Sequence, residues 1–374
     1  MKAAVGVSRH LDLERACLDA TEQALLSLGK ETAPDLLWCV TVDHPVAGME
    51  HAVAAMQKRS GAREVLANTA AGLYVAPRAQ EVEGEPTVGV MLIHGDPELD
   101  IWSGRTRRPP WRGRPTAVLV DPDAGAAGTL TAVQELVDPE RLAGGAAMGV
   151  ETDALVLHHG VGAVDHAAVG MGAGVCEVVL AQGCAPLGDA LTVTAVDGNL
   201  VLELDGEPAL GRILEQLGPR ERADAARSLA RCSVGLAEVG DAQGIVEGRY
   251  CVRRLVGVAP DIGAIAIAEV ARVGQPLALV RSDGPLAERA LSNAVTRLKN
   301  RLAGAVPRAA LYFSCAGRGR RMYGRPNVDV EVLQRALPRV PILGMASGFE
   351  LGPGRSGPSM HMFSGVLMVL AEGS

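Results

Sequence analysis

Aromatic residues are scarce in this chain of 374 residues, which contains three Phe, three Trp and four Tyr. Hydrophobic residues nevertheless make up 48% of the chain, so the core must be built from Ala, Val, Leu and Gly. Side chains this small suit close packing of helices on sheets and leave room for ligands. The chain is also longer than one hydrophobic core usually spans, which predicts two or three domains.

An excess of basic charge is also lacking, because the formal net charge is -7. This balance argues against a nucleic-acid partner or an anionic membrane surface. No apolar run approaches the roughly 20 residues that cross a bilayer. The N-terminal stretch carries acidic residues and differs from a signal peptide. We therefore expect a cytoplasmic protein with no membrane span and no nucleic-acid partner.

Cysteine pairs and common catalytic motifs are missing as well. The seven cysteines include no C-x-x-C pair, which is typical of a reduced, cytosolic chain and not of a disulfide framework. There is no P-loop, H-E-x-x-H or G-x-S-x-G motif. The spacing of His158, His159 and His166 matches no common zinc pattern, so we interpret them as polar surface residues. We expect no metal site.

The most informative feature that is present is a sequence pattern that recurs along the chain. Residues 35–75 and 310–353 both have the pattern strand, turn, helix, strand and Gly-rich turn, and residues 116–150 offer a looser third copy. Repeated strand–helix–strand units predict α/β layers, because helices must cover the faces of each sheet. We predict layered mixed sheets in a four-layer α-β-β-α arrangement, with the Gly-rich turns converging on a cleft.

The region between the second and third copies has a different pattern. Residues 190–206 alternate apolar and polar side chains around Asp197-Gly198-Asn199, which predicts a β-hairpin. Residues 250–283 predict two or three more antiparallel strands. Helices are expected at 208–218, 220–234 and 285–304, the last with Leu286, Ala290, Ala294 and Leu298 on one face. We place a domain boundary in the polar run near residue 222, giving domains 1–222 and 223–374.

The stretch "LYFSCAGRGRRMYG", residues 311–324, raises the first hypothesis about function. Cys315 follows an apolar run and precedes Gly317 and Gly319, a position at a strand end where open α/β sheets place ligand crevices. Backbone N–H groups of such a turn can bind an anion, and Arg318 can clamp a carboxylate or phosphate. The alternative is that Cys315 is a small buried hydrophobe and the arginines lie in solvent.

A second Gly-rich turn contains Glu350, alone among apolar and small residues. A buried carboxylate without a partner is costly, so we expect the Arg318 region to pair with it. From sequence, a structural ion pair and half of an amino-acid site look the same. Cys315 as a nucleophile would need a base, which His361 could supply only through the fold.

His361 stands between Met360 and Met362, before the last predicted strand. A soft apolar pocket with one imidazole could hold haem. The same spacing places both methionines on one face of a strand and His361 on the other, which is ordinary alternation. We favour the ordinary explanation and expect no cofactor.

Several segments together resemble the FIST family (F-box and intracellular signal transduction proteins). "FSCAGRG", "GFELGP" and residues 253–283 resemble motifs of the FIST C-terminal domain. The stretches that resemble the FIST N-terminal domain are "LANTAAGLYV", "AVLVDPDA", "RLAGGAAMG", "VVLAQGCAPLGD" and "LELDGEPAL". The resemblance runs from about residue 35 to the C-terminus, and the order of the motifs carries it. The chain is similar to a free-standing bacterial-type FIST protein.

The resemblance implies a sensory module that binds small ligands such as amino acids. Some members are haem-binding nitric-oxide sensors that act on histidine kinases, and others are substrate-recognition parts of ubiquitin ligases. It also implies a set of ligand-binding residues: Cys315, Gly317, Arg318, Gly319, Gly348 and Glu350, with Asp121, Gly144, Gly145 and Gln182 from the N-terminal half. Two departures stand out: "LANTAAG" lacks a cysteine often seen there, and Phe349 occupies a place where a small residue is common.

We interpret the chain as a cytoplasmic sensory protein of signal transduction that binds an amino acid or small anion. Arg318 would take a carboxylate, and Glu350 would hold an amine or position Arg318. A signalling partner such as a histidine kinase would receive the signal. Two alternatives stay open: a haem-binding nitric-oxide sensor that partners a histidine kinase, and an enzyme with Cys315 as nucleophile.

Overall fold

The computed structural model describes residues 1–29, 32–77, 79–103, 113–122, 139–149, 153–172, 174–354 and 357–373. The chain forms two compact units. The first unit comprises residues 1–181, 288–360 and 364–374, and the second comprises residues 182–287 and 361–363. The C-terminal part of the chain therefore folds together with the N-terminal half. Residue 222, where the sequence analysis divides the chain, lies within the second unit.

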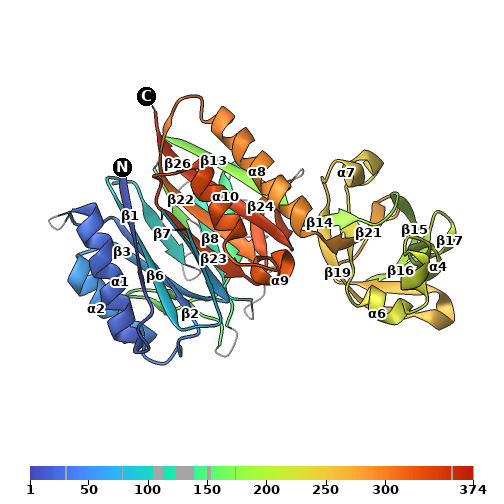
Figure 1. Ribbon diagram of the computed structural model, residues 1–374, viewed down its shortest axis with the longest axis horizontal. Coiled ribbons are helices and arrows are strands. Elements are labelled where there is room, and N and C mark those ends of the chain that lie inside the picture. Colours follow the sequence, from blue (N-terminus) through green and yellow to red (C-terminus); the bar gives the residue numbers. More distant parts are fainter. Residues whose placement is uncertain are drawn as a thin grey trace. The chain divides into compact units, whose positions relative to one another are not determined.

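The first sheet of the first unit has six strands in the order β1-β6-β2-β3-β10-β11. Their bounds are Lys2–Ser8 (β1), Thr87–His94 (β6), Leu36–Val42 (β2), Glu64–Ala70 (β3), Val156–His158 (β10) and Gly162–Ala163 (β11). Helices α1 (Leu13–Leu28) and α2 (Met49–Ser60) cover one face of this sheet. Figure 1 shows both helices in blue along that face.

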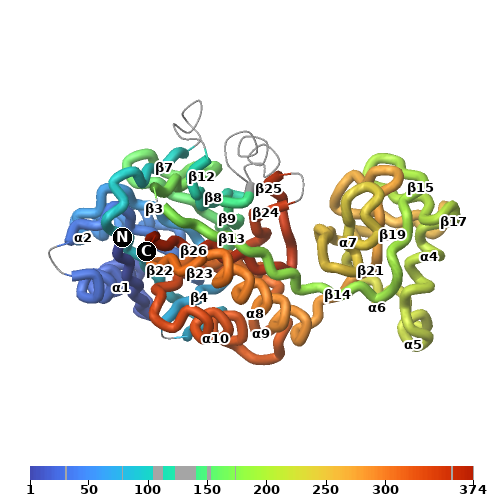
Figure 2. Tube along the Cα trace, turned by 90° about the horizontal axis from the view of Figure 1, so that it is seen from above, coloured from blue at the N-terminus to red at the C-terminus, as the bar shows by residue number. Residues whose placement is uncertain are grey.

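The second sheet has the order β13-β26-β22-β23-β4-β5. Its strands are Val175–Gln182 (β13), Ser364–Glu372 (β26), Val306–Cys315 (β22), Ile342–Ser347 (β23), Gly72–Ala76 (β4) and Gln80–Glu83 (β5). Helices α8 (Gly284–Arg301) and α10 (Val328–Ala336) pack on it, and the short α9 (Gly319–Tyr323) follows β22. Chain segments far apart in sequence therefore share this sheet, and the two termini lie side by side (Figure 2), with the Met1 amino group paired to Glu372.

A third sheet has the order β25-β24-β9-β8-β12-β7. Its strands are Gly357–His361 (β25), Glu350–Gly354 (β24), Leu142–Ala146 (β9), Thr116–Val120 (β8), His166–Gly170 (β12) and Asp100–Ser103 (β7). A single turn of 3₁₀ helix, Pro139–Arg141, leads into β9. Side chains of all three sheets meet in one hydrophobic cluster.

Alternation of side chains along each strand builds the layers. In β2, Trp38 and Val40 face the central cluster between the sheets, whereas Leu37 and Cys39 face α1 and α2. In β22, Phe313 faces the central cluster and Tyr312 faces α8 and α10. Successive residues of a strand point to opposite faces, so each strand serves two layers. The predicted α/β fold with four layers is confirmed.

The recurring sequence pattern corresponds to three parallel strand pairs: β2 with β3, β22 with β23, and β8 with β9. The connection between β2 and β3 is the helix α2, and the connection between β22 and β23 contains α9 and α10, so both are helical, as the sequence predicts. The helix expected between β8 and β9 falls on residues 123–138, which lie outside the described part of the chain. Each pair has an antiparallel neighbour, namely β6, β26 and β12.

The second unit is built on antiparallel strands, as the alternating pattern predicts. The strands are Cys184–Pro186 (β14), Leu191–Asp197 (β15), Leu200–Leu204 (β16), Glu207–Pro208 (β17), Ser233–Leu236 (β18), Cys251–Ala259 (β19), Ala264–Ile267 (β20) and Pro276–Ser282 (β21). The β15–β16 hairpin turns at Gly198, whose φ is +58°. Pairing of β18 with β21 closes six of the strands into a ring. The alternating pattern predicts the strands but not this closure.

The helices of the second unit are short: Ala209–Glu215 (α4), Pro219–Arg222 (α5), Ala225–Leu229 (α6) and Ala242–Val246 (α7), with a 3₁₀ turn at Pro260–Ile262. The long helix α8 begins at Gly284, as expected, but its buried face is rotated from the predicted one. Ala294 and Leu298 are buried, whereas Leu286 and Ala290 are only partly buried, and Leu291 and Val295 complete the packed stripe. None of the helices formed by the described residues is long and apolar enough to cross a membrane.

Candidate functional site

The two Gly-rich turns and β9 come together in the first unit. Cys315, the last residue of β22, pairs with Ser347, the last residue of β23. The next residues continue the contact, because the N–H of Gly348 donates to the carbonyl of Ala146 at 3.3 Å. Glu350 then pairs with Gly145. The predicted site residues 315, 348, 350, 144 and 145 thus lie on neighbouring strand ends.

Asp121 lies near this group, whereas Gln182 has contacts of its own. Asp121 directly follows Val120, which pairs with Ala146 of β9, and its N–H donates to the carbonyl of Asp165 at 2.8 Å. Gln182 belongs to the second unit, where its amide donates to the carbonyl of Tyr250 at 3.4 Å. We therefore describe Gln182 apart from the other predicted residues.

The glycines at this convergence are required by close backbone approach. A Cβ on Gly144 would lie 2.3 Å from the carbonyl oxygen of Val118, and a Cβ on Gly145 would lie 2.4 Å from Oγ of Ser347. Gly319 has a φ of +60°, in the left-handed region that favours glycine. A Cβ there would also meet the carboxylates of Glu81 and Glu83. Small residues here let the strands and turns approach each other.

Arg318 is entirely buried, which its surroundings in the sequence do not suggest. Its Nε and Nη2 donate to the two carboxylate oxygens of Asp329, each at 2.9 Å, and Nη2 also donates to the hydroxyl of Tyr323 at 2.6 Å. This planar, bidentate geometry is the strong form of an Arg–carboxylate pair. Asp329 lies on α10 and is also fully buried. The carboxylate that Arg318 holds in this structure belongs to the protein itself.

Further hydroxyl groups complete the surroundings of Asp329. Tyr312 donates to Oδ2 at 2.7 Å and Tyr323 to Oδ1 at 2.6 Å. Burial alone would raise the pKa of Asp329, but the charge and hydrogen bonds of Arg318, with those of the two tyrosines, hold that pKa below its ordinary value. Asp329 therefore stays ionised, and its charge offsets that of Arg318.

Glu350 has a different environment, although it too is entirely buried. Its Oε2 accepts hydrogen bonds from Oγ of Ser364 at 2.6 Å and from the N–H of Ser364 at 3.4 Å. Its Oε1 has no hydrogen-bond partner among the described residues. Burial raises the pKa of Glu350 well above its ordinary value, although Ser364 and the charge of Arg318 oppose this shift. Oγ of Ser347, where the two Gly-rich turns meet, is likewise buried with no hydrogen-bond partner among the described residues.

The expected pairing of Glu350 with Arg318 needs qualification. Arg318 acts on Glu350 through its charge, but its bidentate partner is Asp329. Asp329, Tyr312 and Tyr323 are not among the site residues predicted from the sequence. Their signal in the sequence is weak, because Asp329 sits in the first turn of an apolar helix, where an acidic residue is common for its own reasons. The ligand-binding roles given to the ten site residues stay predictions.

The remaining candidates can be placed as follows. The Cys315 thiol is buried, and its Sγ accepts a long contact from the N–H of Gly317 at 3.4 Å. His361, the last residue of β25, is buried, whereas its neighbours Met360 and Met362 are partly buried. A nucleophilic role for Cys315 and a haem-binding role for His361 both stay predictions. In the described part of the chain, no group of three or more His, Cys, Asp or Glu side chains is arranged to hold a metal ion.

Comparison with known proteins decides the family. Residues 37–207 match the FIST N domain and residues 209–353 match the FIST C domain. The chain belongs to the FIST family. The first match ends at residue 207 and the second begins at residue 209, so the predicted boundary near residue 222 lies within the second match. FIST domains are in general sensory domains of signal transduction.

Curated relatives of this FIST chain come from mycobacteria. The chain is 34% identical over 197 residues to "Uncharacterized protein Mb0898c" of Mycobacterium bovis and to "Uncharacterized protein MT0897" of Mycobacterium tuberculosis. It is 32% identical over 197 residues to "Uncharacterized protein MT0656" of Mycobacterium tuberculosis. Each match covers 52% of this chain, and the chain spans about half the length of the curated relatives it matches.

Proposed function

We propose that this FIST protein is a sensor of a small ligand that carries an amino group, such as an amino acid, and that Glu350 holds the ammonium. One observation carries the proposal: Glu350 is wholly buried, and its Oε1 has no partner among the described residues. One oxygen of this buried carboxyl group therefore lacks a hydrogen-bond donor. An ammonium would supply it as a charge-assisted hydrogen bond.

The state of Arg318 supports an amine in preference to a simple anion. Asp329 already takes two nitrogens of the guanidinium and cancels its charge. A ligand carboxylate would meet a neutral pair, and its attraction to Arg318 would be correspondingly weak. The charge pattern therefore favours an amine, or the ammonium group of an amino acid, at Glu350.

Signalling would follow from the position of the site at the ends of β22, β23 and β9. The turns after these strands hold one another through backbone hydrogen bonds, including Ala316 to Ser347 and Ala146 to Phe349. A ligand that binds one turn better in one arrangement than in another shifts the population of arrangements. A partner that contacts this edge, such as a histidine kinase, would detect that shift.

Calorimetric titration against a panel of amino acids, amines and organic acids tests the proposal. We expect at least one amino acid or amine to bind, and Glu350→Gln to weaken its binding at least tenfold, the loss of one hydrogen bond to a charged group. The matched control is Glu331→Gln, because Glu331 is a surface carboxylate paired with Arg325. Binding only by organic acids, or equal affinity of Glu350→Gln and wild type, contradicts the proposal.

A further inference from the structure

A line of three polar side chains lies in the first unit, away from the Gly-rich turns. Oγ of Ser103, at the end of β7, is 3.0 Å from Nδ1 of His158. Nε2 of the same imidazole is 3.3 Å from Oε2 of Glu64, the first residue of β3. The three residues come from separate strands, and His158 ends β10. A hydroxyl, an imidazole and a carboxylate are thus joined in series.

The carboxylate decides the direction of the hydrogen bonds. An ionised carboxylate only accepts, so Nε2 of His158 must carry the proton that it shares with Glu64. In the neutral ring, Nδ1 is then an acceptor, and the hydroxyl of Ser103 must donate to it. This is the arrangement of an activated nucleophile, in which a base takes the hydroxyl proton and a third group orients the base.

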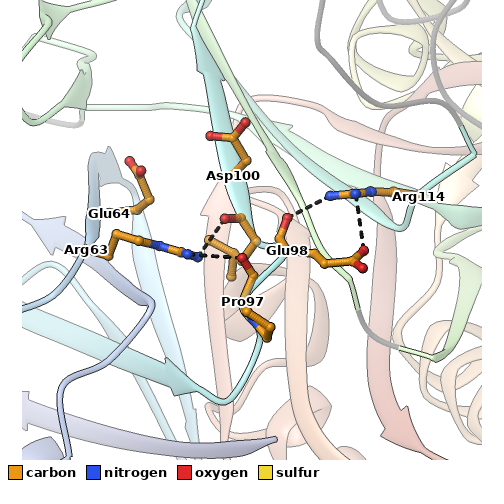
Figure 3. Close-up of a pocket in the computed structure, with 7 residues that line it drawn as sticks. Arg63, Glu64, Pro97, Glu98, Asp100 and Arg114 are labelled. Carbon is orange, nitrogen blue, oxygen red and sulfur yellow. Dashed lines mark hydrogen bonds and ion pairs between the residues drawn. The ribbon is translucent and has the colours of Figure 1, made fainter.

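Cavities adjoin two members of the series. His158 lines a cavity of about 360 Å³ together with Glu50, His159, Gly160 and Gly162. Glu64 lines another, of about 460 Å³. In Figure 3 the carboxylate of Glu64 points away from Arg63, whose guanidinium is bonded to backbone carbonyls of the loop at residues 97–99. Glu64 is therefore free of that arginine and available to His158.

The three side chains differ in how much of their surface is exposed. Ser103 has 7% of its surface exposed, and the side chains of His158 and Glu64 have 12% and 25%. Low exposure strengthens the hydrogen bonds between the three groups. The imidazole is the member that a small molecule in the 360 Å³ cavity reaches first.

We propose that Ser103 is an acyl-accepting nucleophile, with His158 as its general base and Glu64 as the residue that orients His158, and that small carboxylic esters are its substrates. Oγ of Ser103 forms a bond to the ester carbonyl carbon while its proton passes to Nδ1 of His158. The bond to the alcohol breaks, and the alcohol leaves with that proton. Water then adds to the acyl group, gives a proton to Nδ1, and releases the acid as the proton returns to Oγ.

This inference is independent of the proposed amino-acid site, because no residue of the series belongs to the Gly-rich turns. It also corrects the interpretation of His158 as a polar surface residue. His158 is largely buried and bonded on both ring nitrogens.

The test uses the full chain and a fluorophosphonate probe, which bonds covalently to activated serines, with intact mass and peptide mapping as the readout. We expect one phosphonyl group per chain, located on Ser103, and hydrolysis of p-nitrophenyl acetate that the probe abolishes. Ser103→Ala should take up no probe. Absence of labelling at Ser103 in the folded wild-type chain overturns the proposal and leaves the series a structural tie between strands.

Two variants separate activation from a purely structural role. His158→Gln should slow labelling by 10² to 10⁴-fold, the usual contribution of a general base, and Glu64→Gln should slow it at least tenfold. The matched control is His51→Gln, because the imidazole of His51 pairs with Glu14 at 3.7 Å on the exposed surface. Thermal unfolding of each variant shows whether it is folded. Labelling of folded His158→Gln at the wild-type rate contradicts the proposal.

Discussion

Arg318 and Asp329 form a bidentate ion pair in which neither side chain is exposed to solvent. The arginine follows the strand β22 and the aspartate lies on α10, so the pair fastens the Gly-rich turn to the helix that covers the second sheet. Tyr312 and Tyr323 complete the hydrogen bonding of the carboxylate. The Gly-rich turn of residues 315–319 is thereby fastened to α10 by a buried ion pair.

Removal of Asp329 should strongly destabilise the first unit. Asp329→Ala leaves a buried guanidinium without its carboxylate, which costs about 3 to 5 kcal/mol when one member of a buried pair is lost. Urea unfolding measures the change. Glu331→Gln removes the exposed pair with Arg325 and should cost less than about 1 kcal/mol. Equal unfolding free energies for the two variants would show that the buried pair does not hold the turn.

Gly144 and Gly348, which both lie where the strand ends meet, should respond differently to substitution by alanine. In Gly144→Ala the new Cβ would lie 2.3 Å from a backbone oxygen of Val118, which cannot move without distorting β8. We expect a loss of about 1 to 3 kcal/mol from overpacking. In Gly348→Ala the nearest atom is the Cβ of Ala146 at 3.6 Å, so the change should be within about 1 kcal/mol. Thermal unfolding distinguishes them, and a greater loss for Gly348→Ala contradicts this account.

Glu81 should make stability fall as pH rises. Burial raises the pKa of Glu81 to about 8, helped by the neighbouring Glu83 and opposed by the N–H of Asn327. The folded chain therefore keeps a proton that the unfolded chain loses at lower pH. Its contribution to the unfolding free energy is complete below the ordinary glutamate pKa and is lost between there and about pH 8, by at most about 1.4 kcal/mol per pH unit.

Glu81→Gln should flatten this part of the pH profile, because the variant has no proton to lose. Urea unfolding of both proteins between pH 5 and about pH 8 gives the difference. Glu85→Gln is the control, since Glu85 forms an exposed pair with Arg9. A profile for Glu81→Gln that runs parallel to that of the wild type would mean that Glu81 titrates normally.

The sequence predicts the layers well and the side-chain pairs poorly. The apolar runs at 36–42 and 310–315, each followed by a helical pattern, suffice for the four-layer fold, because strand alternation and helix periodicity are local signals. Closure of the second unit depends on the pairing of β18 with β21, strands separated by two others in the chain, and nothing local specifies that pairing. The burial of Arg318 was equally hidden, since an arginine in a basic run usually lies in solvent.

In the candidate site, too, the sequence predicts where the backbone segments meet but not which side chains pair. The strand ends near Cys315, Glu350 and Gly145 follow from the repeated units, because corresponding turns meet at one edge of paired sheets. The partner of Arg318 does not follow, because Asp329 is eleven residues away and its direction depends on how α10 docks. The hydrogen-bonded series of Ser103, His158 and Glu64 joins three strands, and the spacing of these residues in the sequence does not predict their contact.

The most direct test of the central claim is proton release on ligand binding. Burial raises the pKa of Glu350, and an ammonium would require the ionised carboxylate. Titration of the bound amino acid at pH 7 in buffers of different ionisation enthalpy should therefore show release of up to one proton per site, and Glu350→Gln should show none. Binding of the same amino acid to wild type with no proton release, or with release that survives in Glu350→Gln, would contradict the claim that Glu350 holds the ammonium.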